Sequence, residues 1–81
     1  PRAKSLLEPL DELGPEYRQT LLAYLDSSCS SVEAARILGT HRNTMRVRID
    51  RIRERLSVDL DNPDERLALH LALRTTERGG N

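Results

Sequence analysis

The sequence is poor in aromatic residues and in cysteine. Its 81 residues include no Phe, no Trp, two Tyr and one Cys. A single Cys cannot form an internal disulfide, so the chain is not a disulfide-stapled secreted scaffold, and its thiol fits a reducing, cytoplasmic compartment. Two aromatic residues are too few to stack a run of unpaired bases, which argues against a binder of single-stranded nucleic acid.

Long apolar runs and catalytic clusters are lacking as well. No stretch approaches the roughly 20 apolar residues of a membrane span, and the charged start of the chain has no signal-peptide core. Cys29, His41 and His70 are too sparse for a structural zinc site. Neither a glycine-rich phosphate loop nor a pair of carboxylates in an apolar setting is present. We therefore expect no enzyme activity, no metal and no cofactor.

Leucine is what the sequence has in abundance. There are 14 Leu residues, whereas Val and Ile together number six, too few for a convincing sheet. The composition predicts an all-α fold, a small bundle of about four helices. Residues 1–14 are expected to be a lead-in of one or two turns from a missing amino-terminal domain, since Pro9 interrupts their pattern. The helical domain is expected over 15–76 and a disordered tail over 77–81.

Capping signals and periodicity place the helices at about 15–27, 31–38, 41–56 and 63–76. Ser30 and Glu33 have the spacing of a capping box, and Gly39 suits the left-handed end of the second helix. Thr40 is the expected cap of the third helix. Asn62 is the expected cap of the last helix, which Pro63 opens.

Apolar spacing predicts which faces of the last two helices are buried. The third helix carries one narrow stripe, at Met45, Ile49, Ile52 and Leu56. The fourth helix carries Leu67 and Leu71 on one face, with Leu69 and Leu73 on nearly the opposite face. Either this helix is simply well buried, or one face covers the core and the other contacts a second subunit or the missing domain. Leu69 and Leu73 are the candidate homodimer face.

Charge is balanced overall and uneven along the chain. The chain has 13 basic and 13 acidic residues, and a net charge of zero taken alone disfavours a nucleic-acid partner. Residues 1–40 carry −2, residues 41–56 carry +4 and residues 57–81 carry −2. All six basic residues of the middle segment are Arg, which suits bidentate contacts to phosphate or guanine. The positive charge is therefore concentrated on one predicted helix.

The arrangement of a short helix, a glycine turn and a longer helix over residues 32–55 is the layout of a helix-turn-helix. Ala35 and Gly39 are small where such helices approach and turn, although this spacing alone is a weak signal. Asn43, Thr44 and Val47 lie opposite the apolar stripe, at the start of the helix that enters the major groove in such motifs. Val47 is apolar on a polar face, by chance or as a contact to a thymine methyl. The remaining alternative is an interaction bundle whose Arg-rich helix binds an acidic protein.

The central residues resemble one known family. Ala34-Ala35, Leu38-Gly39 and His41-Arg42-Asn43-Thr44, together with the later Asp59–Leu69 segment, are similar to the carboxy-terminal helix-turn-helix of the purine-catabolism-regulator (PucR) and sugar-diacid-regulator family. The resemblance covers about residues 19–74, whereas the Fis-type domain is similar over the central motif only. The family usually has Tyr at the position of Val47 and Leu at that of Met45. The change at Val47 removes a hydroxyl that could touch DNA.

The resemblance implies a domain of a bacterial transcription regulator that binds specific double-stranded DNA through residues 41–56 in the major groove. It implies an effector-sensing domain amino-terminal to this segment, and action as a dimer on two half-sites is expected of so small a module. The expected DNA-binding residues are Thr40, His41, Arg42, Asn43, Thr44, Arg46, Val47, Arg48 and Arg51.

Overall fold

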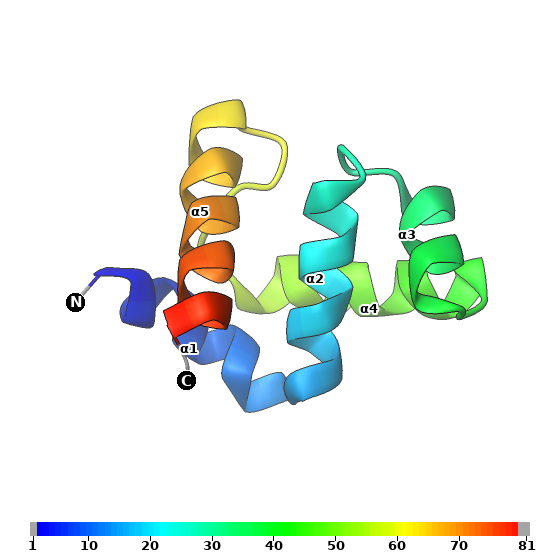
Figure 1. Cartoon of the computed structure of the whole chain (residues 1–81), viewed down its shortest axis with the longest axis horizontal. Helices are drawn as coiled ribbons and strands as arrows, with labels where there is room; N and C mark the ends of the chain where they lie inside the picture. Colours follow the sequence, from blue (N-terminus) through cyan, green and yellow to red (C-terminus); the bar gives the residue numbers. More distant parts are fainter. Residues whose placement is uncertain (1, 80–81) are drawn as a thin grey trace.

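Five helices connected by short loops make up the described part of the chain (Figure 1). The computed structural model describes the backbone of residues 2–79 and the side-chain surroundings of residues 6–76, and it contains no strand in that part of the chain. The helices are α1 (Arg2–Leu13), α2 (Pro15–Asp26), α3 (Ser31–Leu38), α4 (Arg42–Arg55) and α5 (Pro63–Gly79). The all-α expectation is confirmed, with one helix more than predicted.

Helix α2 is the centre of the fold. It contacts all four other helices, whereas α3 contacts only α2 and α4. In Figure 1, α2 stands between α5 and α3, and α4 crosses behind its middle. The aliphatic core comes mainly from Leu side chains of α1, α2 and α5 and from the predicted stripe of α4. Its fully buried large members are Leu7, Leu10, Leu21, Met45, Ile52, Leu60, Leu69 and Leu73.

The expectation of a lead-in of one or two turns over residues 1–14 is wrong for the part that the structure describes. Residues 2–13 form a continuous helix with Pro9 inside it. Proline removes one backbone hydrogen bond, but Leu7 and Leu10 are 1% and 0% exposed in the same core as the other helices. The free energy gained by burying these two side chains exceeds the cost of the lost hydrogen bond. Gly14, at φ 122°, is the single residue between α1 and α2 and has a backbone angle that favours glycine.

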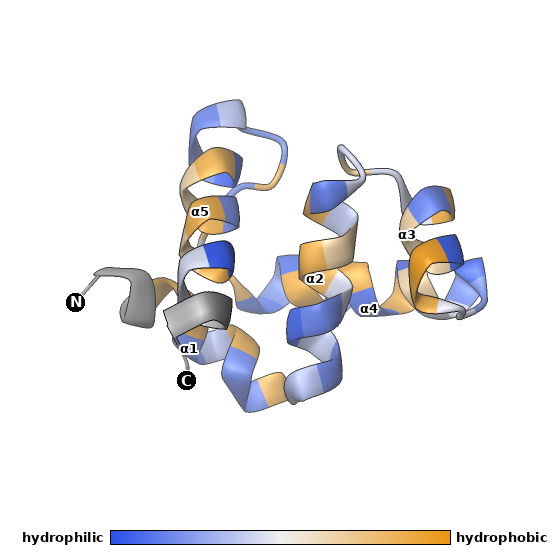
Figure 2. Ribbon diagram, viewed as in Figure 1, coloured by the Kyte–Doolittle hydropathy of each residue, from blue (hydrophilic) through white to orange (hydrophobic). Residues whose placement is uncertain are grey.

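Helix α5 differs from expectation in its length and in its faces. It continues to Gly79, three residues past the predicted end, so the predicted tail lies partly in the helix, and residues 80–81 lie outside the described part. Leu69 and Leu73 are fully buried in this chain's own core, whereas Leu67 and Leu71 are each 56% exposed. Leu69 and Leu73 therefore cannot form a dimer contact. Figure 2 shows apolar residues along the middle of α5.

Side-chain caps fix the starts of α3 and α5 as the sequence predicts. Ser30 Oγ accepts a hydrogen bond from the Glu33 backbone N–H at 3.1 Å. Glu33 does not complete the capping box, because its carboxylate pairs with Arg36 instead. Asn62 Oδ1 accepts from the backbone N–H groups of two residues in the first turn of α5, at 2.9 and 3.1 Å. These caps satisfy backbone donors that a helix start otherwise leaves unpaired.

Candidate nucleic-acid interface

The α3–α4 unit has the geometry of a helix-turn-helix. Gly39 adopts φ 66°, the left-handed conformation that ends α3. The Gly39 N–H donates to Arg36 O and the Thr40 N–H to Ala35 O, at 3.2 and 3.0 Å, which together form a Schellman motif. Ala34 and Ala35 are 0% and 4% exposed, so small side chains lie where the helices approach. The turn predicted from Ala35 and Gly39 is therefore present.

The start of α4 is capped by His41 rather than by Thr40. His41 Nδ1 accepts a hydrogen bond from the Asn43 backbone N–H at 3.0 Å, and His41 has the extended backbone of a cap residue. The helix consequently begins at Arg42, one residue later than expected. The prediction of Thr40 as cap is wrong because a histidine nitrogen can accept the same bond that a hydroxyl usually accepts. Thr40 keeps a place in the turn, half-buried.

The first two turns of α4 present four rows of side chains, each made of residues four apart. One row faces the core, since Met45 and Ile49 are 0% and 4% exposed. The opposite row is Asn43 and Val47, and Val47 is 59% exposed. The two flanking rows are Arg42 with Arg46 on one side and Thr44 with Arg48 on the other. We call the Asn43–Val47 row the crest of α4 and the two arginine-bearing rows beside it the flanks.

The six arginines of α4 fall into two groups. Arg53 lies 3.4 Å from Asp61, and Arg55 donates to Glu12 at 3.0 Å. Among the residues whose side chains the structure describes, no carboxylate pairs with the other four. Those four are Arg42, Arg46, Arg48 and Arg51. The positive charge of α4 is therefore free of ion pairs in the amino-terminal part of the helix and bound to acidic side chains at its carboxy-terminal end.

Arg53 is held additionally by a tyrosine. Its guanidinium donates to Tyr24 Oη at 3.3 Å, and the Arg53 side chain is only partly exposed. Partial burial acts to lower the pKa of Arg53, but the Tyr24 hydrogen bond and the Asp61 carboxylate together raise it above its ordinary value. Arg53 thus ties α4 to α2 and to the loop after α4, and it is a structural residue.

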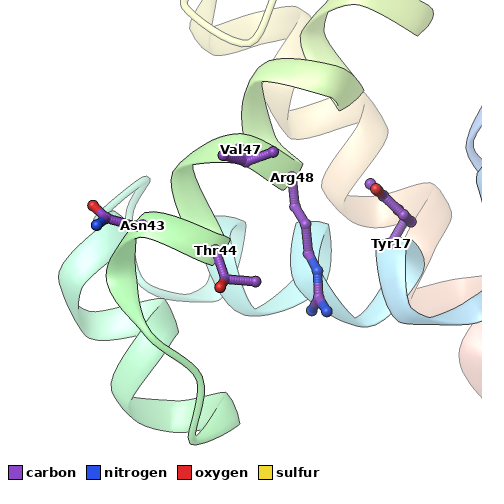
Figure 3. A pocket seen from close by; sticks show the side chains of 5 residues that line it. All are labelled: Tyr17, Asn43, Thr44, Val47 and Arg48. Carbon is purple, nitrogen blue, oxygen red and sulfur yellow. The ribbon is translucent and has the colours of Figure 1, made fainter.

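Two hollows adjoin Val47 on the outer surface of α4. The larger, about 330 Å³, is lined by Tyr17 of α2 and by four residues of α4 (Figure 3). Those four are Asn43, Thr44, Val47 and Arg48. The smaller, about 200 Å³, lies towards the carboxy-terminal end and is lined by Val47, Asp50, Arg51 and Glu54. The first hollow is bordered by one arginine and no acid, whereas two carboxylates border the second.

The structure brings most of the predicted site residues together and adds one. His41, Arg42, Asn43, Thr44, Arg46 and Val47 are exposed, and Arg48 is half-buried beside Tyr17. Tyr17, on α2, is not among the site residues predicted from the sequence. Its ring packs against the core, and the approach of α2 to α4 makes it part of the lining of the hollow. No sequence signal links these two segments.

Cys29 and His70 lie away from α4, in the loop after α2 and on α5. Cys29 is a half-buried free thiol, and His70 Nε2 lies 2.6 Å from Asp26 Oδ1 in a bridge between α5 and α2. Within the described residues, no group of three His, Cys, Asp or Glu side chains is placed to hold a metal ion. Across the same residues, none of the helices is long and apolar enough to cross a membrane.

Comparison with known proteins gives a consistent result. The family model of the PucR C-terminal helix-turn-helix domain matches residues 17–75. An uncharacterised protein of the pkwA 5′ region from Thermomonospora curvata is 40% identical over 74 residues, covering 88% of this chain and 41% of that protein. The carbohydrate diacid regulator of Escherichia coli (strain K12) is 38% identical over 60 residues, covering 74% of this chain and 16% of that protein.

A third relative is the purine catabolism regulatory protein of Bacillus subtilis (strain 168), which is 40% identical over 55 residues, covering 68% of this chain and 10% of that protein. The chain therefore spans less than half the length of each of these relatives. No solved structure matches it. The chain belongs to the PucR C-terminal helix-turn-helix domain family, whose members are DNA-binding domains of transcription regulators and not enzymes.

Proposed function

We propose that this chain binds specific sequences of double-stranded DNA by laying the amino-terminal half of α4 in the major groove. The observation that carries the proposal is the division of the α4 arginines into two that pair with a carboxylate and four that pair with none among residues 6–76. An arginine already paired with a carboxylate gains less from a phosphate, because the carboxylate must be displaced. Three of these four, Arg42, Arg46 and Arg48, lie in the amino-terminal half of α4, the part of a second helix that meets DNA in helix-turn-helix docking, and Arg51 lies in the second half.

The four rows of α4 support separate roles in DNA binding, with different residues contacting bases and phosphates. Asn43 and Val47 form the crest, so they are placed to meet base edges. An amide can read adenine, and a valine methyl can contact the methyl of thymine. The flanking arginines point towards the sides of the helix, where the sugar–phosphate walls of a groove lie. Base reading by the crest and phosphate binding by the flanks is the assignment that follows.

The test is selection of binding sequences from random duplex DNA, followed by titrations at several salt concentrations. Log affinity should fall with log salt by about 0.9 per phosphate neutralised. Arg46→Ala should weaken binding clearly, and Arg55→Ala is the matched control, because Arg55 lies on the same helix and is paired with Glu12. An equal effect of the two substitutions contradicts the proposal. Salt-dependent binding to an acidic protein, without discrimination among duplexes, supports the interaction-bundle alternative.

We further propose that the domain acts as a homodimer through the exposed face of α5. Leu67 and Leu71 are its apolar residues, and Asp64 and Arg74 lie outside them, with the Arg74 side chain 59% exposed although it pairs with Asp26 of the same chain. When two copies of α5 pair antiparallel with Leu67 opposite Leu71 of the second copy, the same register places Asp64 opposite Arg74. This self-complementary arrangement of apolar and charged residues favours a second copy over an unrelated partner.

Analytical ultracentrifugation tests this contact. The wild-type chain should show a concentration-dependent dimer, and Leu67→Gln should remove it without loss of helix content, since Gln is a good helix former at an exposed position. Ser31→Ala, on the distant α3, serves as the control. A wild-type chain that stays monomeric at all concentrations, both alone and on a duplex carrying two half-sites, refutes the contact.

The greater length of the relatives supports one more proposal, that an effector-sensing part of a longer regulator lies amino-terminal to this domain. The two relatives named as regulators are matched over only 16% and 10% of their length. Comparison of DNA binding by the longer protein with and without candidate effectors tests it. Identical binding under all conditions contradicts a sensing role.

A further inference from the structure

The hollow between α2 and α4 is lined by one side chain that α4 does not supply, the tyrosine of α2. Tyr17 reaches it from the first turn of α2, and Figure 3 shows the Arg48 side chain lying between those of Thr44 and Tyr17. No hydrogen bond joins the Tyr17 hydroxyl to any residue whose side chain the structure describes. Tyr17, which carries a hydroxyl, and Arg48, which carries a guanidinium, therefore line the same open space of about 330 Å³.

Tyr17 is held in place before any ligand arrives. Its ring packs against the core as one of the half-buried apolar residues, so it has little freedom to lose on binding. The neighbouring Arg18 is not available to the hollow, because it is bound to Asp11 at 3.2 Å and to Thr76 at 2.8 Å. Tyr17 is thus the side chain of α2 that is available to a ligand in the hollow.

Charge and position determine which part of a duplex fits here. Arg48 gives the hollow positive charge, and no carboxylate lines it, whereas Asp50 and Glu54 line the second hollow. The Thr44–Arg48 flank lies to one side of the Asn43–Val47 crest, so it meets the wall of a groove when the crest meets its floor. The wall of the major groove is the sugar–phosphate backbone.

We propose that this hollow binds one phosphate of the DNA backbone, with Arg48 supplying charge and the Tyr17 hydroxyl donating a hydrogen bond. The inference rests on the proposed placement of α4 in the major groove. Tyr17 then fixes the depth and rotation of α4, because its ring belongs to the rigid α2 and not to α4 itself. It is a positioning residue that reads no base, and Arg48 belongs to the phosphate-binding arginines.

The experiment compares Tyr17→Phe with Tyr24→Phe, since both substitutions remove one phenolic hydroxyl. Binding is measured by titration on a duplex selected by the wild-type chain and on a scrambled duplex of equal length, and thermal melting checks the fold. Tyr17→Phe should weaken binding by about ten- to a hundredfold on both duplexes, the range of a hydrogen bond to a charged group. Tyr24→Phe should leave both affinities near wild type, because that hydroxyl serves Arg53 inside the protein.

Salt titrations and modified duplexes separate the two residues. Arg48→Gln should reduce the salt slope by about 0.9, whereas Tyr17→Phe should leave it unchanged, because a neutral hydroxyl releases no counterion. Neutral methylphosphonate groups, placed one at a time, should identify one phosphate at which Tyr17→Phe loses less affinity than the wild type does, because only the Arg48 contact remains to be lost there. That non-additivity is the signature of a direct contact.

Each result is decisive. A loss by Tyr17→Phe on the selected duplex alone assigns Tyr17 to a base and overturns the inference, and so does wild-type affinity of this variant on both duplexes. Additive losses at every methylphosphonate position overturn it too. Failure of the wild-type chain to bind any duplex refutes the proposed function itself, a different outcome from the failure of this subsite in a chain that binds DNA.

Discussion

The two faces of α5 permit a sharp test of the packing, because the same substitution can be made on both. Leu69→Ala removes a side chain that is 0% exposed, whereas Leu67→Ala removes one that is 56% exposed. Leu-to-Ala changes at fully buried sites cost about 3–5 kcal/mol, the sum of lost burial and the cavity left behind. For Leu67, less than half of the roughly 2 kcal/mol of side-chain burial is at stake, and Ala gains slightly in helix propensity. We expect its cost to stay below about 1 kcal/mol.

The difference is large relative to the stability of the domain. A chain of 81 residues unfolds with roughly 4–12 kcal/mol at the usual values per residue. Leu69→Ala should therefore shift the urea midpoint far towards zero, while Leu67→Ala barely moves it. The measurement is urea unfolding followed by circular dichroism at 222 nm, at a protein concentration low enough that dimerisation does not contribute. Equal costs of the two substitutions, or a larger cost at Leu67, refute the assignment of the faces.

Four further outcomes follow from the structure. Ser27→Ala should raise the free energy of unfolding by up to about 1 kcal/mol in thermal melts, because the buried Ser27 hydroxyl has no hydrogen-bond partner among the described residues; a loss would reveal a hidden partner. Gly39→Ala should cost about 1 kcal/mol from its left-handed backbone alone, since an added Cβ meets nothing within 4 Å; a neutral result in the same assay would contradict that conformation. The hydrogen bond and charge of Arg36 hold the pKa of Glu33 below its ordinary value. The stability that this pairing contributes is present above the pKa of Glu33 in the unfolded chain, and it is lost as the pH falls through the pKa of Glu33 in the folded chain. Carboxyl NMR should show the pKa of Glu33 rising in Arg36→Gln, and an unchanged pKa would contradict the pairing. Asp50→Asn should strengthen binding to all duplexes alike in salt titrations, and a gain confined to one sequence would instead assign Asp50 to a base.

Local signals predicted much of the fold correctly. Ser30 and Asn62 cap their helices as expected, and the spacing of the α4 stripe gave its buried face, because caps and periodicity depend on residues near one another in sequence. The prediction from Pro9 was wrong because the backbone hydrogen bond that proline removes costs less free energy than the burial of Leu7 and Leu10 contributes. That burial depends on α5, far along the chain.

The faces of α5 and the role of Tyr17 could not be predicted from local patterns. Leucines on both sides of α5 make either side equally suitable for a core, and only the packing of α1 and α2 decides between them. The resemblance suggested that Val47 deprives the site of a hydroxyl. Tyr17 lines the same hollow as Val47 and brings a hydroxyl to it from another helix. Such a relation between distant residues is invisible in one sequence.

The small size of the buried side chains on α3 has a consequence for motion. Its fully buried side chains are Ala34 and Ala35, Leu38 is partly buried, and Val32 and Ile37 are 61% and 53% exposed. A short helix that buries so little apolar surface opens at lower cost than α2 or α5, so its amide hydrogens should exchange with solvent well before theirs. Because α3 packs against α4, a ligand bound to α4 should slow the local opening of α3. Hydrogen exchange in α3 should thus respond to occupancy of a surface that α3 itself need not touch.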